Sequence, residues 1–245
     1  MKCVVLAAGY ATRLYPITEN FPKPLLKVGK KTIIDWLVDD IQTIGKIDEY
    51  IVISNHKFID HFNEWAKTKP FKVTVIDDGT ISNETRLGAV KDIQFAIDKL
   101  NISDDMLVIA GDNLLDFSFS TFIDYALEKN ASCVMRYFEK DVSKLQKAGV
   151  MKVDDEGLIL DMVEKPFKPQ SNWCCPPFYY YCREDVKKVR QGILDGCGTD
   201  APGSFIAWLC KQSKVYAMEM KGDRYDIGDL ESYTEVQSLY KGIIK

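Results

Sequence analysis

Histidine is scarce in this chain, which has only His56 and His61 among its 245 residues. The seven cysteines form no CxxC pair and no cluster with either histidine, so the residue types and spacings of a zinc site are missing. Their odd number and scattered positions favour reduced thiols in a cytosolic protein. The role of the adjacent Cys174 and Cys175 is left open. The composition therefore argues against a fold held by zinc or by disulfides.

Long apolar runs and an excess of basic charge are also lacking. No stretch approaches the roughly 20 apolar residues that span a bilayer. The apolar run at the N-terminus is too short for a signal peptide and lacks a basic flank and a cleavage site. The formal net charge of -4 argues against a nucleic-acid binder, which needs a basic surface to neutralise phosphates. We therefore expect a cytoplasmic protein that binds neither membranes nor nucleic acid, although a local basic pocket for one nucleotide remains compatible.

Short apolar runs that alternate with amphipathic stretches dominate the chain. Apolar runs without internal alternation predict strands covered on both faces, and apolar residues at helical spacing predict helices. Strands alternating with helices imply right-handed crossovers. We therefore predict an α/β fold, with a Rossmann-like, mainly parallel sheet flanked by helices. The predicted strands are 2–7, 50–53, 73–76, 106–110, 132–137, 178–182 and 215–220. The predicted helices are 32–44, 58–65, 87–100, 119–127, 183–193, 204–211 and 230–240.

The pattern changes after Ala148. Apolar runs at 150–153 and 158–163 flank a turn at 154–157, which predicts a hairpin in the C-terminal portion. Residues 166–177 are rich in proline, cysteine and aromatic residues and are predicted to form a lid-like excursion. No internal repeat or linker interrupts the chain, so we expect one domain over residues 1–245.

The loop after the first strand carries the strongest chemical signal. It reads LAAGYATRLYP at residues 6–16 and continues to PKPLL at 22–26. Small residues and Gly9 allow the backbone to approach a bound group, and its N–H groups can then cradle phosphate. Arg13 suits forked contacts with phosphate oxygens, and Lys23 adds a compact charge. A Walker loop is excluded because GxxxxGK[ST] is absent. The alternative, a tight turn with two solvated cations, explains a lone AAG but not the whole run.

Three further motifs carry candidate functional residues. Asp112 follows a predicted strand in Gly-Asp-Asn, where an aspartate is well placed to hold a hard cation such as Mg²⁺. A simple turn or a helix cap is the competing interpretation of Asp112. Asp226 lies in YDIGD at 225–229, in which we expect Asp229 to cap the following helix. Lys165 lies in a Glu-Lys-Pro motif that follows the predicted hairpin.

The loop sequence resembles the signature of the sugar-phosphate nucleotidyltransferase family, approximately LAGGxGTRLxPxT followed by PKPLLPV. This family includes glucose-1-phosphate thymidylyltransferases and mannose-1-phosphate guanylyltransferases. Ala8 and Ala11 replace two of its glycines, and both are small enough for close backbone approach to survive. The other motifs resemble the GDN, EKP and W-x-D-x-G elements of the family, with Tyr225 near the usual tryptophan. The resemblance covers nearly the whole chain in order.

This resemblance implies roles for individual residues. Arg13 would stabilise the leaving pyrophosphate, and Lys23 would stabilise the α-phosphate under attack. Asp112 and Asp226 would hold Mg²⁺, the implied cofactor. The implied nucleotide-binding residues are Leu6, Ala7, Ala8, Gly9, Tyr10, Ala11, Thr12, Arg13, Gly88 and Asp112.

The acceptor substrate is assigned to the later part of the chain. Lys165 would grip the acceptor phosphate, Glu164 would hydrogen-bond its hydroxyls, and Gly149 would lie against the sugar. Residues 1–140 would then be a nucleotide-binding half, and residues 141–245 an acceptor-binding half. Because the chain ends soon after the last predicted helix, we expect no appended acyltransferase domain. Homo-oligomers are common in the family, so an oligomer is expected by analogy.

The implied activity is transfer of a nucleoside monophosphate from a nucleoside triphosphate (NTP) to a sugar 1-phosphate, with release of pyrophosphate (EC 2.7.7). One alternative is a cytidylyltransferase that uses phosphocholine or another non-sugar acceptor. Another is a sensor that binds sugar nucleotides without turnover. A GT-A-like glycosyltransferase is disfavoured because no DxD motif follows a strand. The sequence leaves open the nucleobase, the sugar, the role of Arg86 and whether the aromatic residues of 166–181 line a pocket or a core.

Overall fold

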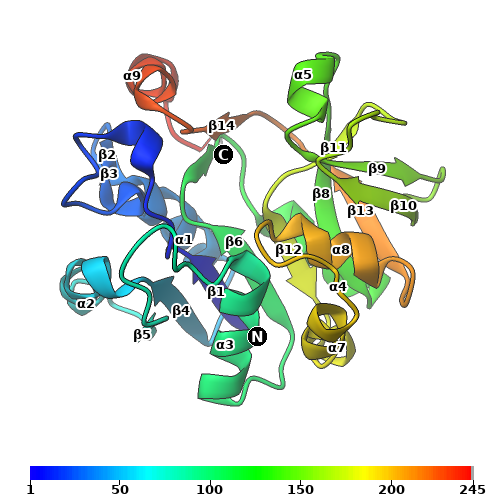
Figure 1. The fold of residues 1–245 in the computed structure, drawn as a ribbon, viewed down its shortest axis with the longest axis horizontal. Coiled ribbons are helices and arrows are strands. Elements are labelled where there is room, and N and C mark those ends of the chain that lie inside the picture. The colour runs from blue at the N-terminus through cyan, green and yellow to red at the C-terminus, as the bar shows by residue number, and fades with distance from the viewer. Residues whose placement is uncertain (244–245) are drawn as a thin grey trace. The chain divides into compact units, whose positions relative to one another are not determined.

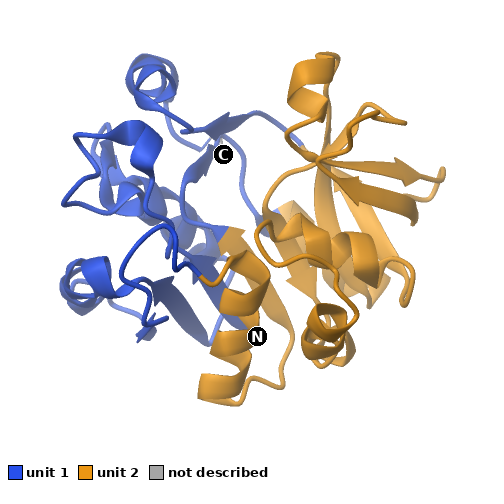
Figure 2. Cartoon of the chain, in the orientation of Figure 1, with its two compact units in different colours: residues 1–86, 110–120, 221–245 blue, residues 87–109, 121–220 orange. Residues whose placement is uncertain are grey.

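The computed structural model describes residues 1–243 of the chain. It contains two compact units, which Figure 2 shows in different colours. Unit 1 consists of residues 1–86, 110–120 and 221–245, and unit 2 of residues 87–109 and 121–220. The chain therefore leaves and re-enters each unit, and these boundaries differ from the predicted division at residue 140. The assignment of nucleotide and acceptor binding to two sequence halves stays a prediction.

Unit 1 is built on parallel strands. Strand β1 (Lys2–Leu6) pairs in parallel with β4 (Glu49–Ser54), which pairs in parallel with β5 (Val73–Asp77). Strand β4 is buried along its whole length, as an apolar run without alternation predicts. Helices α1 (Ile33–Thr43) and α2 (Ile59–Lys67) lie between successive strands in the sequence, and α2 contacts β4 and β5. This parallel arrangement confirms the strand–helix alternation predicted for the first part of the chain.

Two further strand pairs of unit 1 are too short to be predicted. Strands β2 (Lys27–Val28) and β3 (Lys31–Thr32) pair antiparallel, and so do β7 (Asn113–Leu115) and β14 (Arg224–Asp226). Helix α9 (Leu230–Leu239) follows β14, and Asp229 caps it in a capping box with Ser232, as predicted for Asp229. The 3₁₀ helices are η1 (Thr12–Leu14), η2 (Lys23–Leu25) and η3 (His56–Phe58). A core cluster joins η1, α1, β7 and α9 through Leu14, Ile33, Leu114, Ile227 and Val236.

Unit 2 contains a mixed sheet in the order β10-β9-β11-β8-β12-β6, with β13 beside β8. Strand β13 runs parallel to β8, whereas the other pairs are antiparallel. The strands are β6 (Met106–Ala110), β8 (Ser132–Phe138), β9 (Gly149–Val153), β10 (Ile159–Glu164), β11 (Trp173–Cys175), β12 (Phe178–Tyr181) and β13 (Val215–Glu219). The helices are α3 (Ala89–Leu100), α4 (Ser120–Lys129), α5 (Val142–Leu145), α6 (Arg183–Val186), α7 (Val189–Leu194) and α8 (Gly203–Leu209).

The predicted α/β class, with a Rossmann-like sheet flanked by helices, is confirmed (Figure 1). The predicted C-terminal hairpin is also confirmed, because β9 and β10 pair antiparallel. The helix predicted over 183–193 is two helices, α6 and α7. None of the helices within residues 1–243 has the length and apolar character required to span a bilayer.

The segment predicted as a lid-like excursion contains a buried strand instead. Strand β11 lies between β8 and β9, and its residues Cys174 and Cys175 are buried. The three tyrosines of β12, Tyr179 to Tyr181, are buried as well, so they belong to the core. All seven cysteines are free thiols, in agreement with the sequence.

Candidate active site

The loop of residues 7–13 leaves the end of β1 and is tied to the strands beneath it. Leu6 ends β1, and the N–H of Ala7 donates to the carbonyl of Ile53 at 3.0 Å. Ala7, Ala8 and Tyr10 are buried, Gly9 and Arg13 are exposed, and Thr12 begins η1. The buried hydroxyl of Tyr10 lies 3.4 Å from that of Thr80. The loop predicted to cradle phosphate is therefore a fixed element of unit 1.

Ala11 adopts a left-handed backbone, with φ 47° and ψ 41°. This conformation costs a residue with a side chain about 1–2 kcal/mol, and glycine adopts it freely. It explains why the family signature that the loop resembles has glycine at this position, and Ala11 adopts this conformation although it has a side chain. The carbonyl of Ala11 accepts hydrogen bonds from Leu14 N at 2.9 Å and from Thr18 Oγ1 at 2.8 Å, which hold the turn in place.

Lys23 and Asp112 form an ion pair within unit 1. Lys23 begins η2 and is buried, and its Nζ lies 2.8 Å from Oδ2 of the half-exposed Asp112. Burial raises the pKa of Asp112, but the Lys23 ammonium, together with Arg224 and Asn113, lowers it below the usual value. Asp112 is therefore a carboxylate at neutral pH.

Gly111 allows Asp112 to lie close to β1. The N–H of Gly111 donates to the carbonyl of Leu6 at 3.0 Å. A Cβ on Gly111 would lie 3.2 Å from the Val5 side chain and 3.3 Å from that of Pro24. These contacts are tighter than usual, so glycine permits the close approach that places Asp112 beside Lys23.

The pairing of β7 with β14 brings Asp226 to the same region of unit 1. Asn113, the neighbour of Asp112, lies directly opposite Asp226 in this antiparallel pair. Opposed Cα atoms are about 4.5–5.5 Å apart, and successive Cα atoms are about 3.8 Å apart. The Cα atoms of Asp112 and Asp226 therefore lie within about 9 Å of each other.

Arg224 lies between these acidic residues and was missed by the sequence analysis. Its Nη1 donates to Oδ1 of Asn113 at 2.5 Å and lies 3.7 Å from Oδ2 of Asp226. Asn113 in turn donates from Nδ2 to Oδ1 of Asp112 at 2.6 Å. One feature of the sequence could have indicated this contact. Arg224 and Asp226 are two residues apart, and residues two apart on a strand share a face.

Arg13 lies beside the segment that follows Asp226. A Cβ on Gly228 would lie 3.8 Å from Nη1 of Arg13. Hydrogen bonds from Ser232 lower the pKa of Asp229, and the charge of Arg13 lowers it further. Unit 1 therefore brings together Arg13, Lys23, Asp112 and Asp226.

The two carboxylates suit a hard cation. No group of three or more histidine, cysteine, aspartate or glutamate residues forms a metal-ligand cluster within residues 1–243. Mg²⁺ binds through one or two carboxylates and completes its coordination with phosphate oxygens and water. The oxygen donors of Asp112 and Asp226 fit that requirement.

Glu164 of unit 2 lies in a space kept open by two glycines. A Cβ on Gly149 would lie 2.8 Å from Oε2 of Glu164, and a Cβ on Gly203 would overlap the same oxygen. Burial raises the pKa of Glu164, Asp200 raises it further, and the charge of Lys165 opposes both. The sequence analysis did not identify Gly203, the first residue of α8. A glycine at the start of a helix does not indicate a contact with a residue far away in the sequence.

Lys165 has a left-handed backbone, with φ 48°. Positive φ is uncommon for residues other than glycine and often marks functional sites. The N–H of Lys165 donates to the carbonyl of Ala148 at 3.0 Å, which fixes the turn. The Glu-Lys-Pro motif therefore ends β10 with a sharp change of chain direction.

Gly88 of unit 2 packs against backbone. It has φ 92°, and a Cβ there would lie 2.5 Å from the carbonyl oxygen of Thr199. The N–H groups of Ala89 and Val90 donate to the carbonyls of Asp200 and Thr199 at 3.2 and 3.0 Å. This close approach explains the need for glycine, and the place of Gly88 beneath a nucleobase stays a prediction.

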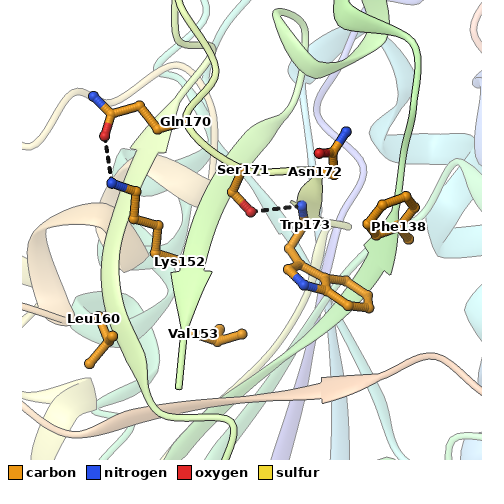
Figure 3. Close-up of a pocket in the computed structure, with 8 residues that line it drawn as sticks. All are labelled: Phe138, Lys152, Val153, Leu160, Gln170, Ser171, Asn172 and Trp173. Atoms are coloured by element: carbon orange, nitrogen blue, oxygen red, sulfur yellow. Dashed lines mark hydrogen bonds between the residues drawn. The ribbon is translucent and has the colours of Figure 1, made fainter. Parts of the chain in front are cut away.

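A surface pocket of about 460 Å³ lies elsewhere on unit 2, and Figure 3 shows its lining. Trp173 and Phe138 pack edge to face there, with ring centroids 5.3 Å apart. Lys152 donates to Oε1 of Gln170 at 2.7 Å. None of the predicted site residues lines this pocket.

The sequence profile of the nucleotidyl transferase family matches residues 2–242. The chain belongs to the nucleotidyl transferase family. It is 27% identical to a glucose-1-phosphate adenylyltransferase of Fervidobacterium nodosum, over 95% of this chain and 59% of that protein. It is 27% identical to the bifunctional protein GlmU of Methanocaldococcus jannaschii, over 93% of this chain and 51% of that protein.

The chain spans only part of the length of these two relatives but nearly the whole length of two other proteins to which it is similar. The UTP–glucose-1-phosphate uridylyltransferase AglF of Haloferax volcanii is 26% identical, over 97% of this chain and 95% of that protein. A solved UDP-glucose pyrophosphorylase, complexed with UDP-glucose, has a TM-score of 0.81 with 21% identity and covers 96% of each chain. This structural similarity shows the shared fold.

Proposed function

We propose that this nucleotidyl transferase transfers a nucleoside monophosphate from an NTP to a sugar 1-phosphate. The glucose-1-phosphate adenylyltransferase and the glucose-1-phosphate uridylyltransferase named above carry this class of activity in their names. In the proposed reaction, an oxygen of the acceptor phosphate forms a bond to the α-phosphorus of the NTP. The bond from the α-phosphorus to the bridging oxygen breaks, and pyrophosphate leaves. The attacking oxygen is already anionic at neutral pH, so the protein needs no nucleophile of its own.

The grouping of two cations with two carboxylates in unit 1 carries the proposal. Lys23 would stabilise the charge on the α-phosphate, and Arg13 the charge that develops on the pyrophosphate. Such preorganised charges are a major source of catalysis in phosphoryl transfer. The loop of residues 6–13 would bind the NTP phosphates through its N–H groups.

Asp112 and Asp226 are the proposed ligands of Mg²⁺. When bound, Mg²⁺ would neutralise phosphate charge and hold the triphosphate in one geometry. The ionised state of Asp112 supports this role, because a carboxylate is the form that binds a hard cation. Arg224, beside Asp226, would help to hold that carboxylate in place.

The acceptor is assigned to residues of unit 2. Lys165 would bind the acceptor phosphate, and Glu164 would hydrogen-bond sugar hydroxyls. The close packing of Gly149 and Gly203 around Glu164 supports a fixed position for its carboxyl group. Gly149 would then act through Glu164, in addition to lying against the sugar.

Cellular location and assembly belong to the same proposal. The seven free cysteines are consistent with reducing cytoplasm, where we place the enzyme. Assembly into a homo-oligomer stays a prediction, as do the nucleotide-binding and acceptor-binding halves of the chain.

Pyrophosphate release tests the proposal directly. Each of the common NTPs would be incubated with Mg²⁺ and a panel of sugar 1-phosphates and phosphocholine, and products identified by mass spectrometry. We expect one pair of NTP and sugar 1-phosphate to give release far above the others. Activity with phosphocholine alone would overturn the acceptor assignment, and nucleotide binding without release would favour a sensor.

A further inference from the structure

We propose that Asn55 and Thr18 are positioning residues for the triphosphate. Each would fix the direction of one peptide group in the loop of residues 7–13, so that the N–H of that peptide faces the bound phosphates. This inference rests on the proposed function and adds to it two residues to which the motifs assign no role, although Thr18 is the last residue of the family signature.

Asn55 is fully buried directly after β4, and both ends of its amide are used. Its Nδ2 donates to the carbonyl of Ala8 at 2.9 Å, and its Oδ1 accepts from Phe58 N at 3.1 Å. A trans peptide is planar, so its C=O and N–H point in opposite directions. The bond to Asn55 therefore turns the carbonyl of Ala8 inward and the N–H of Gly9 away from Asn55.

Thr18 applies the same constraint at the other end of the loop. It is fully buried, and its Oγ1 donates to the carbonyl of Ala11 at 2.8 Å. This bond turns the N–H of Thr12 to the opposite side of the peptide. Ala11 is left-handed and Thr12 begins the right-handed turn of η1, an alternation whose successive N–H groups form an anion-binding concavity.

Paired substitutions separate positioning from simple stability. Thr18→Val removes the donor and keeps the shape, whereas Thr18→Ser keeps the donor. Asn55→Asp keeps an acceptor for Phe58 N but places a carboxylate oxygen against the carbonyl of Ala8. Thr32→Ala is the control, because it removes the cap of α1, at which Thr32 Oγ1 accepts from Asp35 N at 3.2 Å.

The readouts are the Kd of magnesium pyrophosphate, measured by calorimetry, the KM values of both substrates and the melting temperature. We expect Thr18→Val to weaken pyrophosphate binding about tenfold, the equivalent of one hydrogen bond, and Thr18→Ser to restore most of it. Asn55→Asp should weaken binding more at about pH 8 and recover toward the wild-type value at about pH 5, because a protonated carboxyl can donate to Ala8. Thr32→Ala should lower the melting temperature and leave Kd unchanged.

Two results would overturn the inference in distinguishable ways. Wild-type Kd in Thr18→Val and Asn55→Asp would refute positioning and leave the proposed function intact. Weakened binding in Thr32→Ala to the same degree would show that any loss of stability has this effect, and it would also refute positioning. A wild-type protein that neither binds nor releases pyrophosphate would remove the proposed function and the inference together.

Discussion

The ammonium of Lys23 lies 2.8 Å from a carboxylate oxygen of Asp112, although 89 positions separate the two residues in sequence. The lysine is buried, so Asp112 provides the charge that stabilises it there. Removing one partner of a fully buried pair costs about 3–5 kcal/mol of folding free energy, and the cost here is smaller because Asp112 is half-exposed and water screens its charge. The residue proposed to hold Mg²⁺ is therefore also part of the fold of unit 1.

Asp112→Asn tests catalysis with little change in packing. The amide oxygen still accepts a hydrogen bond from Lys23, but the charge that binds Mg²⁺ is lost. We expect pyrophosphate release to fall by about a thousandfold, a typical effect of removing one electrostatic contribution to the transition state. Thermal unfolding should show a folded protein, and a folded variant with the full Mg²⁺-dependent rate would contradict the assignment.

Asp226→Asn tests the second proposed ligand, with Asp223→Asn as its matched control. Both residues are exposed and close in sequence, but only Asp226 lies opposite Asn113. We expect Asp226→Asn to raise the Mg²⁺ concentration required for half-maximal rate by at least about tenfold, because a metal ligand is lost. Asp223→Asn should behave as wild type, and equal effects of the two substitutions would remove Asp226 from the site.

Gly203→Ala tests the position of Glu164. The added methyl would overlap Oε2 of Glu164 and displace the carboxyl group. Alanine favours helix over glycine by about 1 kcal/mol, so α8 itself should not suffer. We expect the KM for the acceptor to rise about tenfold, the equivalent of one hydrogen bond, with the KM for the NTP unchanged.

A double mutant tests whether Gly203→Ala raises the KM for the acceptor by displacing Glu164. If Gly203→Ala acts by displacing the carboxyl group, it should cause little further rise in the KM for the acceptor when Glu164→Gln is already present. Residues that act as a unit are not additive in this way. Full additivity of the two substitutions would show that Gly203 acts on the acceptor by another route.

Glu49 should make the stability of unit 1 depend on pH. Burial raises the pKa of Glu49, but hydrogen bonds from Thr74, Lys72 and Lys2 outweigh it and lower the pKa from 4.5 to about 2. A pKa lowered in the folded state stabilises the protein fully above about 4.5, and that stability is lost as the pH falls toward about 2. We expect Glu49→Gln to lower the free energy of unfolding by about 2 kcal/mol at neutral pH, after allowance for the screening of Lys72.

Denaturant unfolding at about pH 7 and about pH 3 would measure this difference. The difference in unfolding free energy between wild type and Glu49→Gln should narrow at the lower pH. At about pH 3 the unfolded wild type binds a proton at Glu49, whereas the folded state, with its pKa of about 2, keeps the charge. A gap that stays constant over this range would show that the ion pairs of Glu49 do not determine the effect.

The sequence predicts the parts of the site that are local. The loop of residues 6–16 and the Gly-Asp-Asn motif each follow an apolar strand of five residues, and both motifs are continuous in the sequence. The antiparallel pairing of Asn113 with Asp226 is not predictable in this way, because β7 and β14 have three residues each and show no alternation. The family resemblance supplied the link between Asp112 and Asp226, and the structure supplies the strand pair that positions them.

Contacts between segments that are far apart in the sequence could not be predicted either. The space that Gly203 leaves for Glu164 arises because α8 packs against β10, which no local pattern records. Strand β11 was not predicted because it has only three residues, flanked by prolines and aromatic residues. It pairs with a strand on each side, β8 and β9. Asn55 lies in a connecting segment without a motif, and Thr18 ends the family signature without a role of its own. The partners of both donors, the carbonyls of Ala8 and Ala11, become known only from the folded loop.

The pairing of β7 with β14 also gives synthesis on the ribosome an order. In a nascent chain, Lys23 and Asp112 are both present long before Asp226 has been added. Until β14 emerges from the exit tunnel, Asn113 lacks its partner strand and only one of the two carboxylates is present. If these carboxylates hold the metal as proposed, a chain terminated before Arg224 would carry the loop without a complete metal site, and premature termination there would give an inactive product.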